Sequence, residues 1–147
     1  MEEALRRIEL DLMWYAEARM LLDTLGDQLD DLLMPTCAKG SHIGATTGRP
    51  GNPTATRAFR REELRRKIGP ARRVVSWVDA WLPSLRDDDR LLIVVRYGLR
   101  DGEAALLQHA AWAAGIPCDD DAETLAVAEH IRALIADALA FTRRRAA

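Results

Sequence analysis

The stretch LRRIELDLMWYAEARMLLDTLGDQLDDLL, residues 5–33, decides the fold class of this chain. Its apolar residues recur every three or four positions, which is the spacing of one buried face of an α-helix. This first stripe consists of Leu5, Ile8, Leu12, Tyr15, Ala18, Leu22, Leu25, Leu29 and Leu32. Pro35 follows and cannot continue a helix. The spacing therefore predicts one long helix over residues 2–33, weakened at Gly26, which costs about 1 kcal/mol relative to alanine.

A second stripe of the same kind follows a segment without periodicity. Residues 34–53, MPTCAKGSHIGATTGRPGNP, are rich in glycine and proline, which predicts a linker. Asn52 and Pro53 then provide a helix N-cap and a first helical residue. The basic segment 54–85 predicts a second long helix from Pro53 to about Leu82, with a kink or break at Gly69-Pro70. Its apolar positions are Leu64, Ile68, Ala71, Val75, Val78, Leu82 and Leu85.

Residues 86–147 predict three shorter helices. The first, in SLRDDDRLLIVVRYG (84–98), has acids in its first turn and ends at Gly98. The second spans Asp101–Ala114 and the third Asp121–Thr142. The third is predicted to bury Leu125, Ile131, Leu134, Ile135, Ala138 and Leu139. The predicted fold is all-α: a long, coiled-coil-like two-helix hairpin followed by a three-helix, helix-turn-helix-like bundle, with the seam paired within one chain or between two copies.

Composition narrows the class of protein. Of 147 residues, 48% are hydrophobic and 30% charged, which favours a folded globular chain over a disordered one. No apolar run approaches the roughly 20 residues that a membrane span needs. The acidic start, MEEALRRIELDLMW, does not resemble a secretory signal, and two isolated cysteines suit a reducing compartment. We therefore expect a cytoplasmic protein that does not enter a membrane.

Residues suited to catalysis or metal binding are sparse. Cys37 and His42 supply two of the four ligands that a structural zinc site normally needs, and polar loop residues are the simpler interpretation. Asp119–Asp121 lacks the spaced oxygens of a calcium loop and fits a helix start. His109 and His130 fit ordinary, partly buried helix positions. A metal or hydrolytic site requires Cys37, His42 and the aspartates to converge, so we predict a non-enzyme without metal or cofactor.

Charge is segregated along the chain. Residues 1–33 carry nine acids against three bases, residues 54–75 eight bases against two acids, and residues 101–140 eight acids against Arg132 alone. A concentrated run of bases is typical of contact with DNA phosphates. The bases of the middle segment are Arg57, Arg60, Arg61, Arg65, Arg66, Lys67, Arg72 and Arg73. Two alternatives remain: these bases face the acidic first helix, or they form a solvated surface whose exposed ion pairs contribute about 0.2–1 kcal/mol each.

Two further basic features are weaker signals. Arg143–Arg145 suit the negative end of the last helix and are secondary candidates for phosphate contact. Gly48-Arg49-Pro50 is similar to short segments that enter a minor groove, although a flexible linker is the simpler interpretation.

The order of these parts resembles the RinA/ArpU-type late transcriptional regulators of bacteriophages, whose C-terminal part is similar to the DNA-binding fourth region of sigma factors. The resemblance covers roughly residues 5–140 and is carried mainly by GNPTATRA (51–58) and LLIVVRYG (91–98). It implies an all-helical, non-catalytic regulator without a cofactor. Such a regulator binds double-stranded DNA near a late promoter and assists the host RNA polymerase.

One segment departs from this family pattern. The turn GIPCDDDAETLA (115–126) is longer than the family's and acidic, and DNA carries one negative charge per ~1.7 Å of its axis. If the matching helix starts at Val127, His130 and Arg132 are its residues suited to contact bases or phosphates. The alternative function is a helical adaptor that dimerises through its heptad seam, presents the acidic C-terminal half to a basic partner and does not bind DNA.

Overall fold

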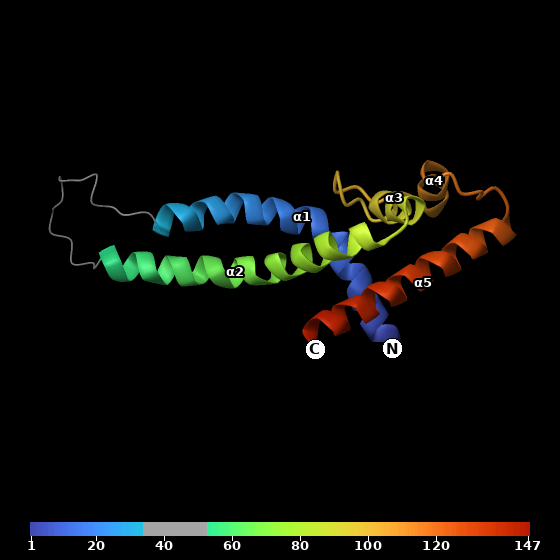
Figure 1. The fold of residues 1–147 in the computed structure, drawn as a ribbon. Helices are drawn as coiled ribbons and strands as arrows, with labels where there is room; N and C mark the ends of the chain where they lie inside the picture. Colours follow the sequence, from blue (N-terminus) through green and yellow to red (C-terminus); the bar gives the residue numbers. More distant parts are fainter. Residues whose placement is uncertain (34–52) are drawn as a thin grey trace.

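The computed structural model describes residues 1–33 and 53–147, and every regular element among them is a helix (Figure 1). The all-α prediction is therefore confirmed for this part of the chain. None of the described helices combines the length and the apolar character needed to cross a membrane. In chain order the elements are α1 (Glu2–Leu33), α2 (Pro53–Trp81), the short 3-10 helix η2 (Leu82–Ser84), α3 (Asp87–Arg96), α4 (Leu107–Ala113) and α5 (Asp121–Ala146).

Helices α1 and α2 pack side by side, and their apolar stripes meet within one chain (Figure 1). At the end next to the linker, Leu29 packs on Leu64 and Ile68, with Leu22 and Leu25 partly buried against them. At the other end the first stripe joins the main core through Leu5, Ile8, Leu12 and Tyr15. The spacing of both stripes thus predicted most of the contact between the two long helices, although the α2 stripe named Val75 where Val74 is the fully buried residue.

Of the kink or break predicted at Gly69-Pro70, the break is absent, because helix α2 continues through both residues. Proline inside a helix costs about 3 kcal/mol because a backbone hydrogen bond is lost. Ile68 and Ala71, on either side, are almost completely buried. Tertiary packing of an amphipathic face supplies most helical stability in proteins, and it outweighs the local cost here.

The main core forms where α5 crosses the α1–α2 pair and α3 closes one side (Figure 1). The rings of Trp77 and Trp81 lie 5.8 Å apart in this core, and the indole nitrogen of Trp81 donates a hydrogen bond to Asp137 of α5 at 3.0 Å. Neither tryptophan belongs to the predicted α2 stripe. They lie on a second face of α2, which α5 and the N-terminal half of α1 cover.

The predicted helix Asp101–Ala114 is wrong over its first half, because α4 begins only at Leu107. Gly98 ends α3 with a positive φ of 63°, and the chain folds back on that end. The amide of Ala105 donates to the carbonyl of Val95 at 3.3 Å, and Arg96 donates to the carbonyl of Ala105 at 2.6 Å. These hydrogen bonds keep the segment before α4 in a non-helical conformation.

Helix α5 runs four residues further than predicted and buries five of the six residues expected: Ile131, Leu134, Ile135, Ala138 and Leu139. The prediction for Leu125 is wrong, since its side chain is 62% exposed, and Val127 is buried instead. From Val127 the buried positions step by four and three, which places Leu125 on the opposite side of the helix.

Candidate nucleic-acid interface

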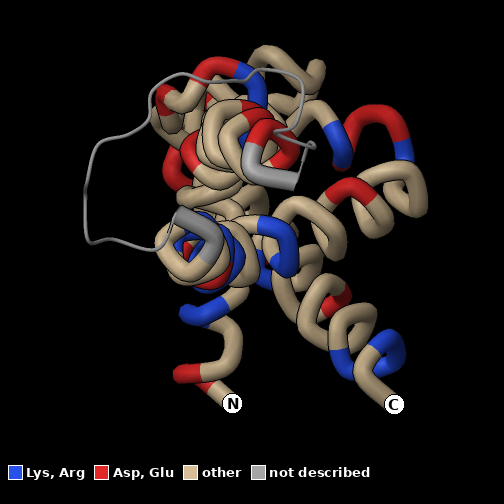
Figure 2. The backbone as a smooth tube through the Cα atoms, turned by 90° about the vertical axis from the view of Figure 1, so that its left-hand side faces the viewer, with Lys and Arg blue, Asp and Glu red and all other residues tan. Residues whose placement is uncertain are grey.

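The most cationic surface of the described residues lies on the first two-thirds of α2. We call Arg60, Arg61, Arg65, Arg66, Lys67 and Arg72 the α2 basic surface; Arg61 is partly buried and the others are exposed. They point outward because Leu64, Ile68 and Ala71 between them are buried. Figure 2, seen from the linker end, shows basic segments gathered on α2 and acidic ones on the neighbouring end of α1.

Most of these cations are not neutralised by the protein. Within residues 1–33 and 53–147, only Arg65 of the α2 basic surface has an ionic partner, Glu62, at 3.9 Å. Both side chains of this pair are more than half exposed, so it contributes little stability. Uncompensated, solvated guanidinium and ammonium groups remain available to an anionic partner.

The alternative that the basic helix pairs with the acidic first helix holds for Arg73. The carboxylate of Asp11 on α1 accepts hydrogen bonds from two guanidinium nitrogens of Arg73 at 3.1 and 3.3 Å, and from the indole nitrogen of Trp77 at 3.1 Å. Two parallel bonds between a guanidinium and a carboxylate are among the stronger ion-pair geometries. Arg73 therefore fastens α1 to α2 and is not free for DNA.

Arg57 also contacts α1, since it donates to the backbone carbonyl of Asp31 at 3.4 Å. That carbonyl belongs to the last turn of α1, where backbone acceptors lack helical partners. Arg57 thus differs from the α2 basic surface, because part of its hydrogen-bonding capacity is used inside the protein.

A second polar cluster joins the two long helices, and here the carboxylate lies on α2 and the donors on α1. The hydroxyl of Tyr15 donates to Asp79 at 2.5 Å, and Arg19 donates to Asp79 at 2.9 Å and to the Tyr15 oxygen at 3.0 Å. Burial, reinforced by the Asp79 carboxylate, raises the pKa of Tyr15. The hydrogen bond with Tyr15 raises the pKa of Arg19. The neutral phenol and the charged guanidinium are therefore the forms that this contact favours.

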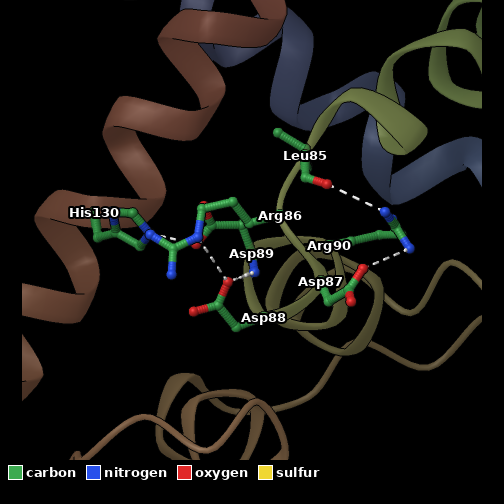
Figure 3. Close-up of polar contacts among 7 residues, drawn as sticks. All are labelled: Leu85, Arg86, Asp87, Asp88, Asp89, Arg90 and His130. Carbon is green, nitrogen blue, oxygen red and sulfur yellow. Dashed lines mark hydrogen bonds and ion pairs between the residues drawn. The ribbon is translucent and has the colours of Figure 1, made fainter.

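The two α5 residues predicted to read DNA contact carboxylates of other helices. A ring nitrogen of His130 lies 2.6 Å from Asp89 in the first turn of α3, and Figure 3 shows the two side chains pointing toward each other. Arg132 donates to Glu2 of α1 at 2.5 Å. Both side chains are about half exposed, but contact with a base requires these pairs to open.

The surroundings of His130 are acidic. Asp87, Asp88 and Asp89 form the first turn of α3, where negative charge is stabilised by the helix dipole (Figure 3). Of these, Asp88 pairs with Arg86 at 3.5 Å, and Asp87 pairs with Arg90 at 3.3 Å. A phosphate that approached His130 would meet this turn and be repelled by it.

The acidic segment before α5 is a set of helix caps. Asp120 is the N-cap, and its carboxylate accepts from the amide of Glu123 at 2.8 Å. The carboxylate of Glu123 accepts from the amide of Asp119 at 3.1 Å, and Asp119 accepts from the indole nitrogen of Trp112 at 3.2 Å. Three acids thus satisfy backbone and indole donors. They also place negative charge where a helix N-terminus would otherwise attract phosphate.

No metal site is formed by the part of the chain that the structure describes, since no three His, Cys, Asp or Glu side chains gather there. The candidates Cys37 and His42, as well as Gly48-Arg49-Pro50, lie outside the described residues. Cys118 is buried, with its sulfur 3.5 Å from the hydroxyl of Thr124.

Comparisons with protein-family models, curated proteins and solved structures found no match to this chain. Sequence reasoning selected the α2 basic surface but missed Asp11, Trp77 and Asp137, whose importance depends on partners more than 50 residues away. A carboxylate at an inward position of an amphipathic helix, such as Asp11 beside Leu12, is the signal that marks such a residue.

Proposed function

We propose that this chain is a non-catalytic, DNA-binding transcriptional regulator of the bacteriophage late type, which contacts the phosphate backbone through the α2 basic surface. The observation that supports this most directly is the group of cations on α2 without an ionic partner among the described residues: Arg60, Arg61, Arg66, Lys67 and Arg72. At 1.5 Å per residue, positions 60–72 extend over about 18 Å of helix. That length spans about half a turn of duplex DNA.

The chemistry of this surface favours phosphates over bases. Its charged groups lie on flexible side chains around the exposed side of α2 and interact with any polyanion, so binding without sequence preference is expected. Arg57 and Arg143–Arg145 are secondary phosphate contacts in this proposal. Recognition of DNA bases in this proposal depends on His130 and Arg132. Their ion pairs with Asp89 and Glu2 must open first.

The finer architecture and partners belong to the same proposal. In it, α1 and α2 act as a coiled-coil-like hairpin, and α3 to α5 act as a degenerate, sigma-like helix-turn-helix unit. The acidic turns at Asp87–Asp89 and Asp119–Asp121 suit a basic protein surface better than DNA. The resemblance supports host RNA polymerase as that partner. Two isolated cysteines support a cytoplasmic location, and the heptad-like stripes support a homodimer.

The test is fluorescence anisotropy of the purified protein with a labelled random-sequence duplex across a salt series. Phosphate contacts predict that log K falls linearly with log salt, with a slope of about −0.9 for each phosphate neutralised. The combined substitutions Arg60→Gln, Arg61→Gln, Arg65→Gln and Arg66→Gln should reduce the slope by about 3–4, since each removes one cation.

A matched control removes the same charge elsewhere. Arg6→Gln, Arg7→Gln, Arg86→Gln and Arg100→Gln also delete four exposed cations, none of them on α2. If the α2 basic surface is the interface, this variant keeps most of the slope. Equal losses in both variants would show a diffuse effect of net charge, and no binding to the unmodified protein at low salt would exclude DNA as the partner of α2.

One observation favours the second candidate, a helical adaptor. Leu10, Met13 and Met20 are 46–69% exposed on α1, and all three lie on the side away from the first stripe. Since that stripe is buried within the chain, protein contact through α1 would use this second side. Multi-angle light scattering tests this by comparing the unmodified protein with the double variant Met13→Gln, Met20→Gln. If the variant loses self-association or partner binding, and the unmodified protein does not bind DNA, the adaptor is favoured.

A further inference from the structure

A cleft of about 530 Å³ lies between α1, α2 and α5, and no residue of the α2 basic surface lines it. Its apolar lining is supplied by Ile8 of α1, Trp77 of α2 and Leu139 of α5. Four arginines line the same cleft: Arg7, Arg73, Arg143 and Arg145. The cleft thus combines an apolar floor with cations from all three helices, although the segments that form it are far apart in sequence.

The charges in this cleft do not balance. Arg73 is paired with Asp11, the one carboxylate in the lining, so these two charges cancel. Four arginines and one aspartate leave a formal charge of +3. Arg7 and Arg143 have no ionic partner within the described residues. A negatively charged group that entered the cleft would therefore find cations that the protein itself does not neutralise.

Arg145 is positioned without losing its charge. Its guanidinium donates to the carbonyl and the hydroxyl oxygens of Ser76 at 3.1 and 3.2 Å, and lies 5.9 Å from the centre of the Phe141 ring. These partners are neutral, so they orient the cation and leave it available to an anion. A fixed cation costs less side-chain entropy on binding than a freely moving one.

We propose that this cleft binds a small organic anion, consisting of a carboxylate or phosphate group on an apolar body. Sites for small molecules commonly enclose 300–1,000 Å³, with mostly apolar walls and a few polar groups that fix orientation. The floor of Ile8, Trp77 and Leu139 would cover the apolar body, while Arg7, Arg143 and Arg145 would hold the anionic group. The proposal does not require DNA binding, because it uses none of the α2 basic surface and shares only Arg143 and Arg145 with the secondary phosphate contacts.

The probe for this site is 1-naphthyl phosphate, titrated into the full chain by isothermal calorimetry. Inorganic phosphate supplies the anion alone and 1-naphthol the apolar body alone, so we expect each to bind at least tenfold more weakly than the combined probe. 1-Naphthoate tests the anion type: similar affinity would indicate any organic anion, and a marked preference would identify the class. Saturable binding with one site per chain is the expected form.

Two variants locate the binding. Arg143→Gln with Arg145→Gln should weaken 1-naphthyl phosphate at least tenfold, whereas Arg60→Gln with Arg61→Gln, which removes the same charge from α2, should not change it. All four residues are exposed or partly exposed, so circular dichroism should show both variants folded. The proposal is overturned if the probe does not saturate, if 1-naphthol binds equally well, or if both variants lose affinity alike. Failure of DNA binding would leave these outcomes unaffected.

Discussion

Asp11 on α1 accepts a hydrogen bond from the indole nitrogen of Trp77 on α2 at 3.1 Å, in the buried contact between the two long helices. Arg73 binds the same carboxylate from the solvent side, so one acid serves a buried neutral donor and a half-exposed cation. This arrangement explains why a charged residue can occupy an inward position: each of its oxygens has a donor. It also fixes which turns of α1 and α2 meet.

Replacing Asp11 by alanine should lower the free energy of unfolding by about 2 kcal/mol, because the Trp77 indole nitrogen loses its acceptor while it stays buried. Arg73 can turn to solvent and adds little to this loss. Chemical denaturation followed by tryptophan fluorescence measures the change. Asp23→Ala, an exposed carboxylate on the same helix, is the control and should alter stability by less than about 0.5 kcal/mol. Equal effects of the two substitutions would contradict the structural role of Asp11.

Substitutions of three glycines with positive φ should separate backbone strain from steric overlap. Gly98→Ala should be the most harmful, because a Cβ atom at Gly98 would lie 2.5 Å from the backbone carbon of Glu103. A Cβ atom at Gly115 would meet nothing within 4 Å, so Gly115→Ala should cost only the left-handed conformation, about 1–2 kcal/mol. Gly102→Ala should behave like Gly115→Ala. Thermal unfolding gives the ranking, and a mild Gly98→Ala would argue against the folded-back segment after α3.

Removal of the N-cap of α5 should destabilise the protein measurably. Asp120→Ala deletes the acceptor for the amide of Glu123 and should cost about 1 kcal/mol. Asp121→Ala, one residue later, removes the same charge near the same helix end and caps no amide. It should cost only the charge–dipole term, about 0.3–1 kcal/mol. Urea unfolding midpoints compare the two, and a larger loss from Asp121→Ala would mean that charge, not capping, explains the acidic segment.

Stability should fall at high pH because of Tyr97. Burial, with the nearby Glu9 carboxylate adding to it, raises the pKa of Tyr97 to about 12 from an ordinary value of 10.0. The unfolded chain therefore releases this proton at lower pH than the folded one. The stabilisation is fully present below pH 10 and is lost as the pH rises from about 10 to about 12. Unfolding by urea at pH 8 to 11 should show the decline, and Tyr97→Phe should make it shallower.

Gly26→Ala should stabilise the protein by about 0.5–1 kcal/mol, because Gly26 lies inside α1 and a Cβ atom there would meet nothing within 4 Å. Gly69→Ala has the same free space in α2, but the residue before Pro70 is disfavoured in the helical region once it carries a Cβ. Its gain should therefore be smaller. Differential scanning calorimetry compares the two variants, and a destabilising Gly26→Ala would mean that α1 is not a regular helix at that point.

The sequence was sufficient where structure depends on local periodicity. The stripes around Leu12 and Ile68 identified both long helices and the surface between them, because a helical period of 3.6 residues places these side chains on one face. The same logic placed Ile131 and Leu134 correctly on α5. Leu125 was misassigned because apolar character alone does not show where α5 emerges from the core.

Contacts between residues that lie far apart in the chain could not be predicted from one sequence. Trp77 and Trp81 are buried because α5 and α1 cover a second face of α2, which no pattern within α2 reveals. The shortened α4 depends in the same way on bonds from the preceding segment to the end of α3. For the candidate interface, composition predicted a cationic α2. Which bases have partners, such as Arg73 with Asp11, was decided by three-dimensional packing.

During synthesis on the ribosome, Trp81 cannot form its hydrogen bond with Asp137 until α5 has been made. Trp81 is completed long before α5, and at about 5–20 residues per second the chain needs roughly 3–12 s to extend from residue 81 to residue 139. During this interval the apolar face around Trp77 and Trp81 lacks the helix that covers it. Helix α5 therefore completes this core, and a ribosome that stalls before Val127 would present the uncovered face to chaperones and proteases.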